Sequence, residues 1–153
     1  VTTCTVADGR QFVFDSEDLP VVKKYTWHIG RCGYVLAHDG GMGIKLHRLL
    51  VQPPDNLFID HIDRNPLNNC RENLRVCSKH QNCFNQGLRS DNRTGYKGVH
   101  YDAKRNELIV RIGYKGQRYT IKRFPPEKLL EAAQAYNQKA LELFGEYAFL
   151  NPV

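Results

Sequence analysis

The sequence predicts an α+β fold: a small β-rich N-terminal platform with a motif of two strands and a helix, followed by a three-stranded antiparallel sheet packed on one helix. Short segments of alternating character, separated by Gly-containing turns, fill the first 58 residues. Three further alternating segments lie between residues 98 and 124, and a helical repeat of apolar residues begins near Pro126. A length of 153 residues suits one or two small domains.

The platform begins with a predicted hairpin. Residues 3–6 and 11–14 alternate in character on either side of a turn at residues 7–10, which contains an Asp-Gly pair. Ser16 is followed by acidic residues and a proline, a pattern that predicts a helical turn or two reaching Tyr25.

A second hairpin is predicted from residues 27–29 and 34–37, joined by the turn at residues 30–33. A strand at residues 44–46 and a short helix at residues 47–50 follow it. The platform should cover the back of the next segment with apolar side chains, among them Trp27, Tyr34, Leu36, Leu46 and Leu49.

The motif at residues 57–85 predicts a strand at residues 57–62, a polar loop, and an antiparallel strand at residues 74–77. Ser78 is a suitable N-cap for a helix that ends near residue 85. The two strands and the helix are expected to converge on one site.

Three side chains of this motif suit metal-dependent phosphodiester hydrolysis. His61 can accept a proton from water near neutral pH. Asp60 and Asn82 offer the carboxylate and amide oxygens that magnesium or manganese prefers, and two protein ligands leave coordination positions open for phosphate and water.

With its Asp-His pair, its Asn-Leu-Arg start to the second strand and its Gln-Asn-x-x-Asn helix, the segment resembles the HNH, or ββα-metal, endonuclease motif. The resemblance implies that His61 is the general base, that Asp60 and Asn82 hold one divalent cation, and that Asn73 braces the loop by hydrogen bonding. Many relatives carry His where Asn82 stands.

Other polar residues in and near this motif suit simpler structural roles. Asn-rich loops commonly serve turns, and Asn65, Asn68 and Asn69 are interpreted in that way. Arg48 suits packing and phosphate contact equally, whereas His28 is expected at the surface, as is His38.

The chain has five cysteines, an odd number without a CxxC pair. Cys70, Cys77 and Cys83 could gather a structural zinc with His80, but their spacing is wrong for a zinc knuckle or ribbon. Reduced, buried thiols are the expected outcome.

Positive charge is concentrated in one part of the chain, which has a net charge of +6. Residues 89–125 hold ten Lys or Arg against three Asp or Glu, a net +7, whereas the segments 1–60, 61–88 and 126–153 carry −1, +2 and −2. Such a localised basic stretch is typical of nucleic-acid binders. No basic amphipathic helix accompanies it, which argues against a membrane partner.

The sequence predicts an HNH domain at residues 1–88, a linker at 89–95 and a second domain at 96–153. Three strands at residues 98–101, 108–114 and 118–124 should each have an apolar and a basic side. A helix from Pro126 to about Phe144, stopped by Gly145, would cover the apolar side.

This second domain contains Gly-Tyr-Lys-Gly-Val at 95–99, Ala-Ala-x-Ala-Tyr at 132–136 and Phe-Gly-Glu-Tyr-Ala-x-Leu-Asn at 144–151. Residues 94–151 thereby resemble the Apetala-two/ethylene-response-factor type of DNA-binding domain. Relatives often carry Trp where Leu108 and Thr120 stand, so base preference does not transfer. From the resemblance and the charge pattern, the predicted DNA-contacting residues are Arg89, Arg93, Lys97, His100, Lys104, Arg111, Arg118, Thr120 and Lys122. The alternative is a solvated basic face.

Together the two resemblances imply a sequence-selective, metal-dependent DNA endonuclease that leaves a 3′-hydroxyl, as in phage and mobile-element homing endonucleases. It would act on double-stranded DNA, as a monomer or homodimer, in the cytoplasm of a bacterial host or a similar cell. One alternative is a DNA-binding regulator that retains the HNH scaffold without cleaving, and another is a structural zinc protein.

Overall fold

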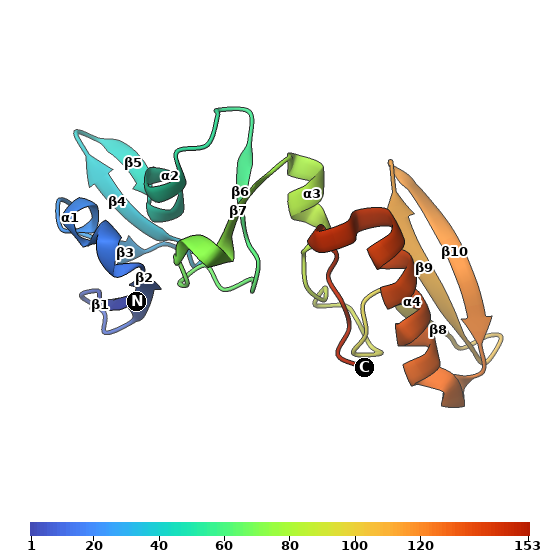
Figure 1. Cartoon of the computed structure of the whole chain (residues 1–153). Helices are drawn as coiled ribbons and strands as arrows, with labels where there is room; N and C mark the ends of the chain where they lie inside the picture. The colour runs from blue at the N-terminus through green and yellow to red at the C-terminus, as the bar shows by residue number, and fades with distance from the viewer. The chain divides into compact units, whose positions relative to one another are not determined.

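The computed structural model describes all 153 residues, which divide into two units, Val1–Asn82 and Cys83–Val153, each with its own core (Figure 1). The boundary expected from the sequence was after residue 88. The contacts divide the chain earlier because Phe84 stacks on Phe144, with 4.0 Å between ring centroids, and the Phe84 carbonyl accepts a hydrogen bond from Lys97.

The first unit consists of three small antiparallel β-structures with short helices between them: the β1–β2 pair, the sheet of order β3-β4-β5, and the β6–β7 pair. All the hairpins predicted in this half are present, with ends that shift by a residue or two. The elements are β1 (Thr2–Thr5), β2 (Gln11–Phe14), the 3-10 turn η1 (Ser16–Asp18), α1 (Leu19–Val22), β3 (His28–Ile29), β4 (Val35–Asp39), β5 (Met42–Lys45), α2 (Leu46–Val51), β6 (Phe58–His61), the 3-10 turn η2 (Arg71–Asn73), β7 (Leu74–Cys77) and α3 (Lys79–Phe84), whose last two residues belong to the second unit.

The core of the first unit lies within the platform. Phe12, Phe14, Val35 and Leu46 are the largest fully buried apolar side chains there, and Trp27 donates its indole N–H to the Val22 carbonyl at 2.8 Å. Burying these side chains is the main stabilising contribution to the unit. Helix α2 packs on β4, β5 and β7, and so connects the platform to the β6–β7 hairpin.

The loop between β6 and β7 is fastened to the platform. The Val13 amide donates to the Leu67 carbonyl at 2.9 Å, and the Asn69 amide donates back to the Val13 carbonyl at 2.8 Å. Arg71 pairs with the buried carboxylate of Asp18 at 2.6 Å. Because the loop is held by backbone bonds and an ion pair, the residues it carries have fixed positions.

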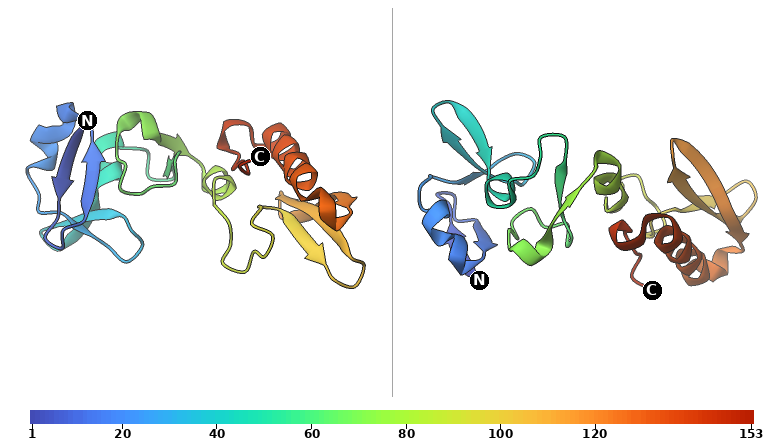
Figure 2. Two further views of the ribbon diagram at one scale, coloured as in Figure 1. Left: turned by 90° about the horizontal axis from the view of Figure 1, so that it is seen from below. Right: turned by 45° about the horizontal axis from the view of Figure 1, so that its top comes forward.

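The second unit is a three-stranded antiparallel sheet, of order β10-β9-β8, covered on one face by a long helix (Figure 2). None of the helices in the chain is both long enough and apolar enough to cross a membrane. The elements of the second unit are β8 (Val99–Asp102), β9 (Glu107–Tyr114), β10 (Gln117–Phe124), the 3-10 turn η3 (Pro126–Lys128), α4 (Leu129–Phe144) and the 3-10 turn η4 (Gly145–Tyr147).

Small residues let α4 approach the sheet closely. Ala132, Ala133 and Ala140 are completely buried in the core of this unit, beside Tyr136. Gly98 has φ +77°, and a Cβ placed on it would lie 2.1 Å from the Tyr136 ring. Only glycine fits this position.

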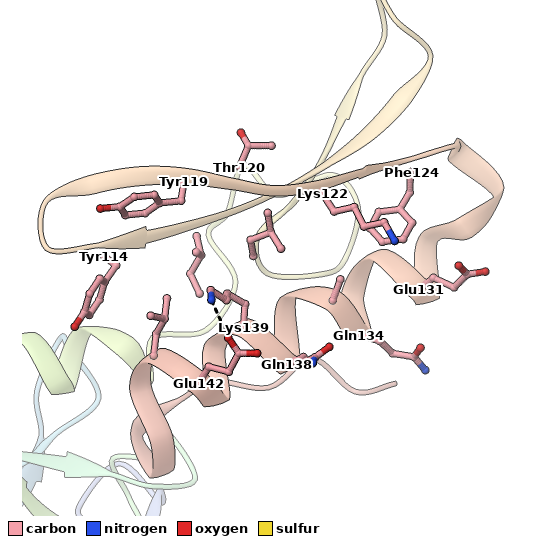
Figure 3. Close-up of a pocket in the computed structure, with 14 residues that line it drawn as sticks. Tyr114, Tyr119, Thr120, Lys122, Phe124, Glu131, Gln134, Gln138, Lys139 and Glu142 are labelled. Carbon is pink, nitrogen blue, oxygen red and sulfur yellow. Dashed lines mark hydrogen bonds and ion pairs between the residues drawn. The ribbon is translucent and has the colours of Figure 1, made fainter.

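A β-bulge in β10 corrects one predicted orientation. The register pairs Thr120 with Arg111 but Lys122 with Val110, so Ile121 is the extra residue. Lys122 therefore lies on the face that carries Val110 and is covered by α4, and its ammonium is 5.0 Å above the Phe124 ring (Figure 3). The sequence predicted Lys122 on the open basic face, because strict alternation was assumed.

Candidate active site

Asp60 and His61 are the last two residues of β6, in the β6–β7 hairpin. Both are buried, at 6% and 5% exposure, and their partners across the pair are Arg75 and Leu74. Arg75 donates to Asp60 Oδ2 twice, from Nε at 2.9 Å and from a terminal nitrogen at 2.6 Å. The Asp60 carboxylate is thus kept in one orientation by a charged neighbour.

His61 is held in place by a residue for which only a turn role was predicted. Its Nε2 lies 3.4 Å from Oδ1 of Asn69, whose side chain is fully buried and whose Nδ2 donates to the Pro66 carbonyl at 3.2 Å. Because Asn69 Oδ1 accepts, the proton of neutral His61 belongs on Nε2, and Nδ1 carries the lone pair.

Burial lowers the pKa of His61, and Asn69, Asp63 and Asp60 only partly offset this effect. The ring is therefore neutral near pH 7 and able to accept a proton.

Asn73 makes the contacts expected of a loop brace. Its Oδ1 accepts from the Asp63 amide at 2.9 Å, and its Nδ2 donates to Asp63 Oδ1 at 2.9 Å and to the Asn68 carbonyl at 2.8 Å. Asp63 in turn accepts from Asn65 and Asn68. Burial alone would raise the pKa of Asp63, but these hydrogen bonds outweigh it and lower the pKa, so the loop is organised around an ionised carboxylate.

Helix α3 begins with a capping box, as predicted for Ser78. The Gln81 amide donates to Ser78 Oγ at 3.2 Å, and the Ser78 amide donates to Gln81 Oε1 at 2.8 Å. This cap sets the direction of the helix that carries Asn82, one turn further along.

Asp60 and Asn82 both neighbour Cys77. Burial and the charge of Asp60 raise the pKa of the Cys77 thiol, while the charge of Arg75 and backbone groups of Asp60 and Asn82 act in the opposite direction. A carboxylate and a side-chain amide are oxygen donors of the kind that magnesium and manganese bind, so this donor set fits the predicted cation.

The cysteines do not converge in the structure. Cys70 and Cys77 are buried free thiols, while Cys83 is exposed. The side chains of Asp15, Glu17 and Asp18 are the one group with metal-ligand spacing, and Arg71 already pairs with two of them.

The platform contributes an aromatic wall that the sequence analysis did not identify. The His47 ring, on α2, lies 5.2 Å from the His61 ring at 84°, and the Tyr34 ring lies 5.1 Å from His47 and 6.0 Å from His61. The Lys45 ammonium lies 5.6 Å from the centre of the Tyr34 ring. Tyr34 was expected to cover the back of the hairpin, but it borders the candidate base instead.

Burial, followed by the charges of His61, Lys45 and Arg48, lowers the pKa of His47 to about 3. Arg48 itself donates to the Leu57 carbonyl at 3.1 Å, a packing role.

In the second unit, four of the predicted DNA-contacting residues share the open face of the sheet. Arg111 is paired with Thr120, Arg118 with Gly113 and His100 with Ile109, and these pairs alternate with the rows that face α4. Burial, then the charges of Arg111 and Arg118, lowers the pKa of His100, as expected for neighbouring groups. This set of His100, Arg111, Arg118 and Thr120 is called the open face below.

The other predicted contacts lie elsewhere. Lys97 is committed internally, since its ammonium donates to the carbonyls of Phe84 and Gln86 at 2.8 and 2.5 Å and lies 5.0 Å from the Phe149 ring centre. Arg89 pairs with Asp91 at 3.3 Å, Arg93 is exposed, and Lys104 lies in the turn between β8 and β9.

A groove of about 940 Å³ lies between β10 and α4. Its lining combines basic, acidic and aromatic side chains, including Lys122, Lys139, Glu142 and Tyr119 (Figure 3). Lys139 and Glu142 form an ion pair at 2.8 Å, so the charges of these two side chains offset one another.

Comparison with known proteins relates the chain to nucleases. The sequence model of the HNH endonuclease family matches residues 52–83. The chain is 37% identical over 149 residues to a protein of Acanthamoeba polyphaga mimivirus named uncharacterized HNH endonuclease L560, covering 93% of this chain and 75% of that protein. It is 30% identical over 95 residues to Protein 3.8 of Escherichia phage T7, covering 62% of this chain and 76% of that protein. No solved structure gives a significant match.

Proposed function

Since the chain belongs to the HNH endonuclease family and is a DNA endonuclease, we propose that it is sequence-selective, depends on a divalent metal and leaves a 3′-hydroxyl. The observation that carries this proposal is that Asp60 and neutral His61, consecutive in the sequence, are both buried and each held by a partner, Asp60 by Arg75 and His61 by Asn69. A fixed oxygen ligand beside a fixed base is what hydrolysis of a phosphodiester requires.

In this proposal His61 Nδ1 takes the proton from the attacking water, and Asn69 keeps the ring in the tautomer that can do so. Asp60 and Asn82 would hold magnesium or manganese, and the bound cation would supply stabilisation of the negative charge that develops during phosphodiester hydrolysis. Asn73 acts through the loop, because it keeps Asp63 and Asn68 in place.

The second unit is proposed to position double-stranded DNA. Its helix-covered three-stranded sheet is the arrangement that the Apetala-two/ethylene-response-factor resemblance implies. The open face concentrates two guanidinium groups with a hydroxyl and an imidazole, which suit phosphates and base edges. We also propose that the enzyme acts inside a cell on double-stranded DNA, in the manner of phage and mobile-element homing endonucleases, as a monomer or homodimer.

The test is metal-dependent nicking of supercoiled plasmid DNA. His61→Ala should lower the single-turnover rate constant by at least about 100-fold, because the general base is lost. DNA binding measured with Ca²⁺ in place of Mg²⁺ should remain, since His61 does not lie on the open face. Unchanged nicking by His61→Ala would exclude His61 as the base, and binding without nicking by the wild type would favour a DNA-binding regulator.

A further inference from the structure

His47 occupies a position that packing alone does not explain. It lies on α2, outside the matched HNH segment, and is 6% exposed. Its ring is perpendicular to the His61 ring, at 5.2 Å, and borders Tyr34. The imidazole therefore lies directly against the candidate base, but from the platform side.

The two nitrogens of His47 have different surroundings. Nδ1 is shut off from solvent and has no hydrogen-bond partner, the one buried side-chain nitrogen or oxygen of the chain in this state. A buried polar atom without a partner is unfavourable, and an apolar ring would fill the same space without that penalty. His47 Nδ1 is therefore expected to lower the stability of the first unit.

The buried edge of the ring determines its tautomer. A buried N–H without an acceptor is rarer in proteins than an under-satisfied acceptor, so the lone pair belongs on Nδ1 and the proton on Nε2. Nε2 is not shut off from solvent in the way that Nδ1 is. His47 consequently offers one fixed N–H donor beside His61, and Lys45 adds a positive charge on the same wall.

We propose that His47 is a further substrate-binding residue, whose Nε2–H donates a hydrogen bond to a non-bridging oxygen of the scissile phosphate. This inference rests on the proposed function, because it requires a phosphodiester to lie between Asp60 and His61. A preorganised donor directed at an oxygen on which charge develops lowers the barrier to hydrolysis. The platform is then part of the active site.

Two variants separate the donor from the packing. His47→Phe keeps a ring but removes the nitrogens, and His47→Gln keeps an N–H donor at the distance of Nε2. In single-turnover plasmid nicking with Mg²⁺ at saturating enzyme, His47→Phe should lower the rate constant about 100-fold, while His47→Gln should stay within about 10-fold of wild type. The midpoint of thermal unfolding should be unchanged or higher in His47→Phe, because an unpaired buried nitrogen is gone.

The nicking rates of these variants test the role of His47 directly. Wild-type nicking by a folded His47→Phe protein would overturn the proposal, as would equal losses in the Phe and Gln variants. If His47→Phe does not fold, His47→Leu replaces it with the same expectation. Loss of nicking in His61→Ala together with retained nicking in His47→Phe would overturn the role of His47 alone. Absence of nicking by the wild type would overturn the proposed function and this inference with it.

Discussion

The candidate active site and the open face bear polar groups in opposite environments. Asp60, His61, Asn69 and Asn73 are each at most 7% exposed, and each has a specific hydrogen-bond or ion-pair partner. On the open face Arg118 and Thr120 are exposed. Removing a buried polar group leaves its hydrogen-bond partners unsatisfied. Removing an exposed charge weakens only its attraction to DNA phosphates, which salt screens and to which each charge contributes nearly independently. Single substitutions should therefore have large effects at the first site and small, cumulative effects at the second.

The largest expected effect follows from removal of the loop brace. Asn73→Ala deletes three hydrogen bonds of a buried side chain and should lower the free energy of unfolding of the first unit by about 2 to 3 kcal/mol. Trp27, the single tryptophan of the chain, lies in the core of that unit, so its fluorescence during urea unfolding reports on that unit specifically. Plasmid nicking should fall as well, because the loop carries Asn69.

Asn65→Ala is the matched control for Asn73→Ala. Asn65 is exposed and its side chain accepts one hydrogen bond, from the Leu67 amide at 3.1 Å. Its loss should cost less than about 1 kcal/mol. Equal decreases in the free energy of unfolding in the two variants would show that burial does not distinguish the asparagines of this loop. The expected difference between buried and exposed polar groups would then be wrong.

Local sequence signals were sufficient for most of the fold. The hairpins have turn residues and alternation that depend only on near neighbours, and β7 spans the predicted residues, Leu74–Cys77. The bulge at Ile121 was not predictable in this way, since it depends on how β10 fits against β9 and α4. Its consequence was the wrong face for Lys122.

The site was predictable only where residues are consecutive or belong to a known motif. Asp60 and His61 are adjacent in sequence, and Asn73 makes the bracing contacts that the HNH resemblance implied. Asn69 was hidden among the other asparagines of the loop, because nothing local marks the one that reaches His61. Tyr34 and His47 come from the platform, and only the tertiary packing of α2 and β4 brings their rings to the site.

A smaller effect on DNA affinity is expected when single positive charges are removed from the open face. Arg111→Ala and Arg118→Ala should each weaken DNA binding about 5- to 10-fold and reduce the slope of log affinity against log salt by about 1. Lys122→Ala removes a charge from the same strand but from the helix side, so affinity should change less than about twofold. Fluorescence anisotropy with a labelled duplex in Ca²⁺ measures all three. A Lys122 effect as large as that of Arg118 would mean that the bulge does not divide the strand into two faces.

The smallest expected effect is a pH dependence of DNA affinity that arises from His100. Burial and the positive charges of Arg111 and Arg118 lower its pKa, with Asp91 partly offsetting them, so the free protein holds His100 neutral at pH 7. A bound phosphate nearby would raise that pKa, and the complex would then bind more protons than the free protein. Affinity should therefore rise about threefold as the pH falls from about 7.5 to about 5.5.

His100→Gln should remove this rise, while every other titrating group is the same in both proteins. A pH response that persists in His100→Gln would place the titrating group elsewhere and take His100 out of the interface. The open face would then consist of the two arginines and Thr120, with a smaller footprint on DNA.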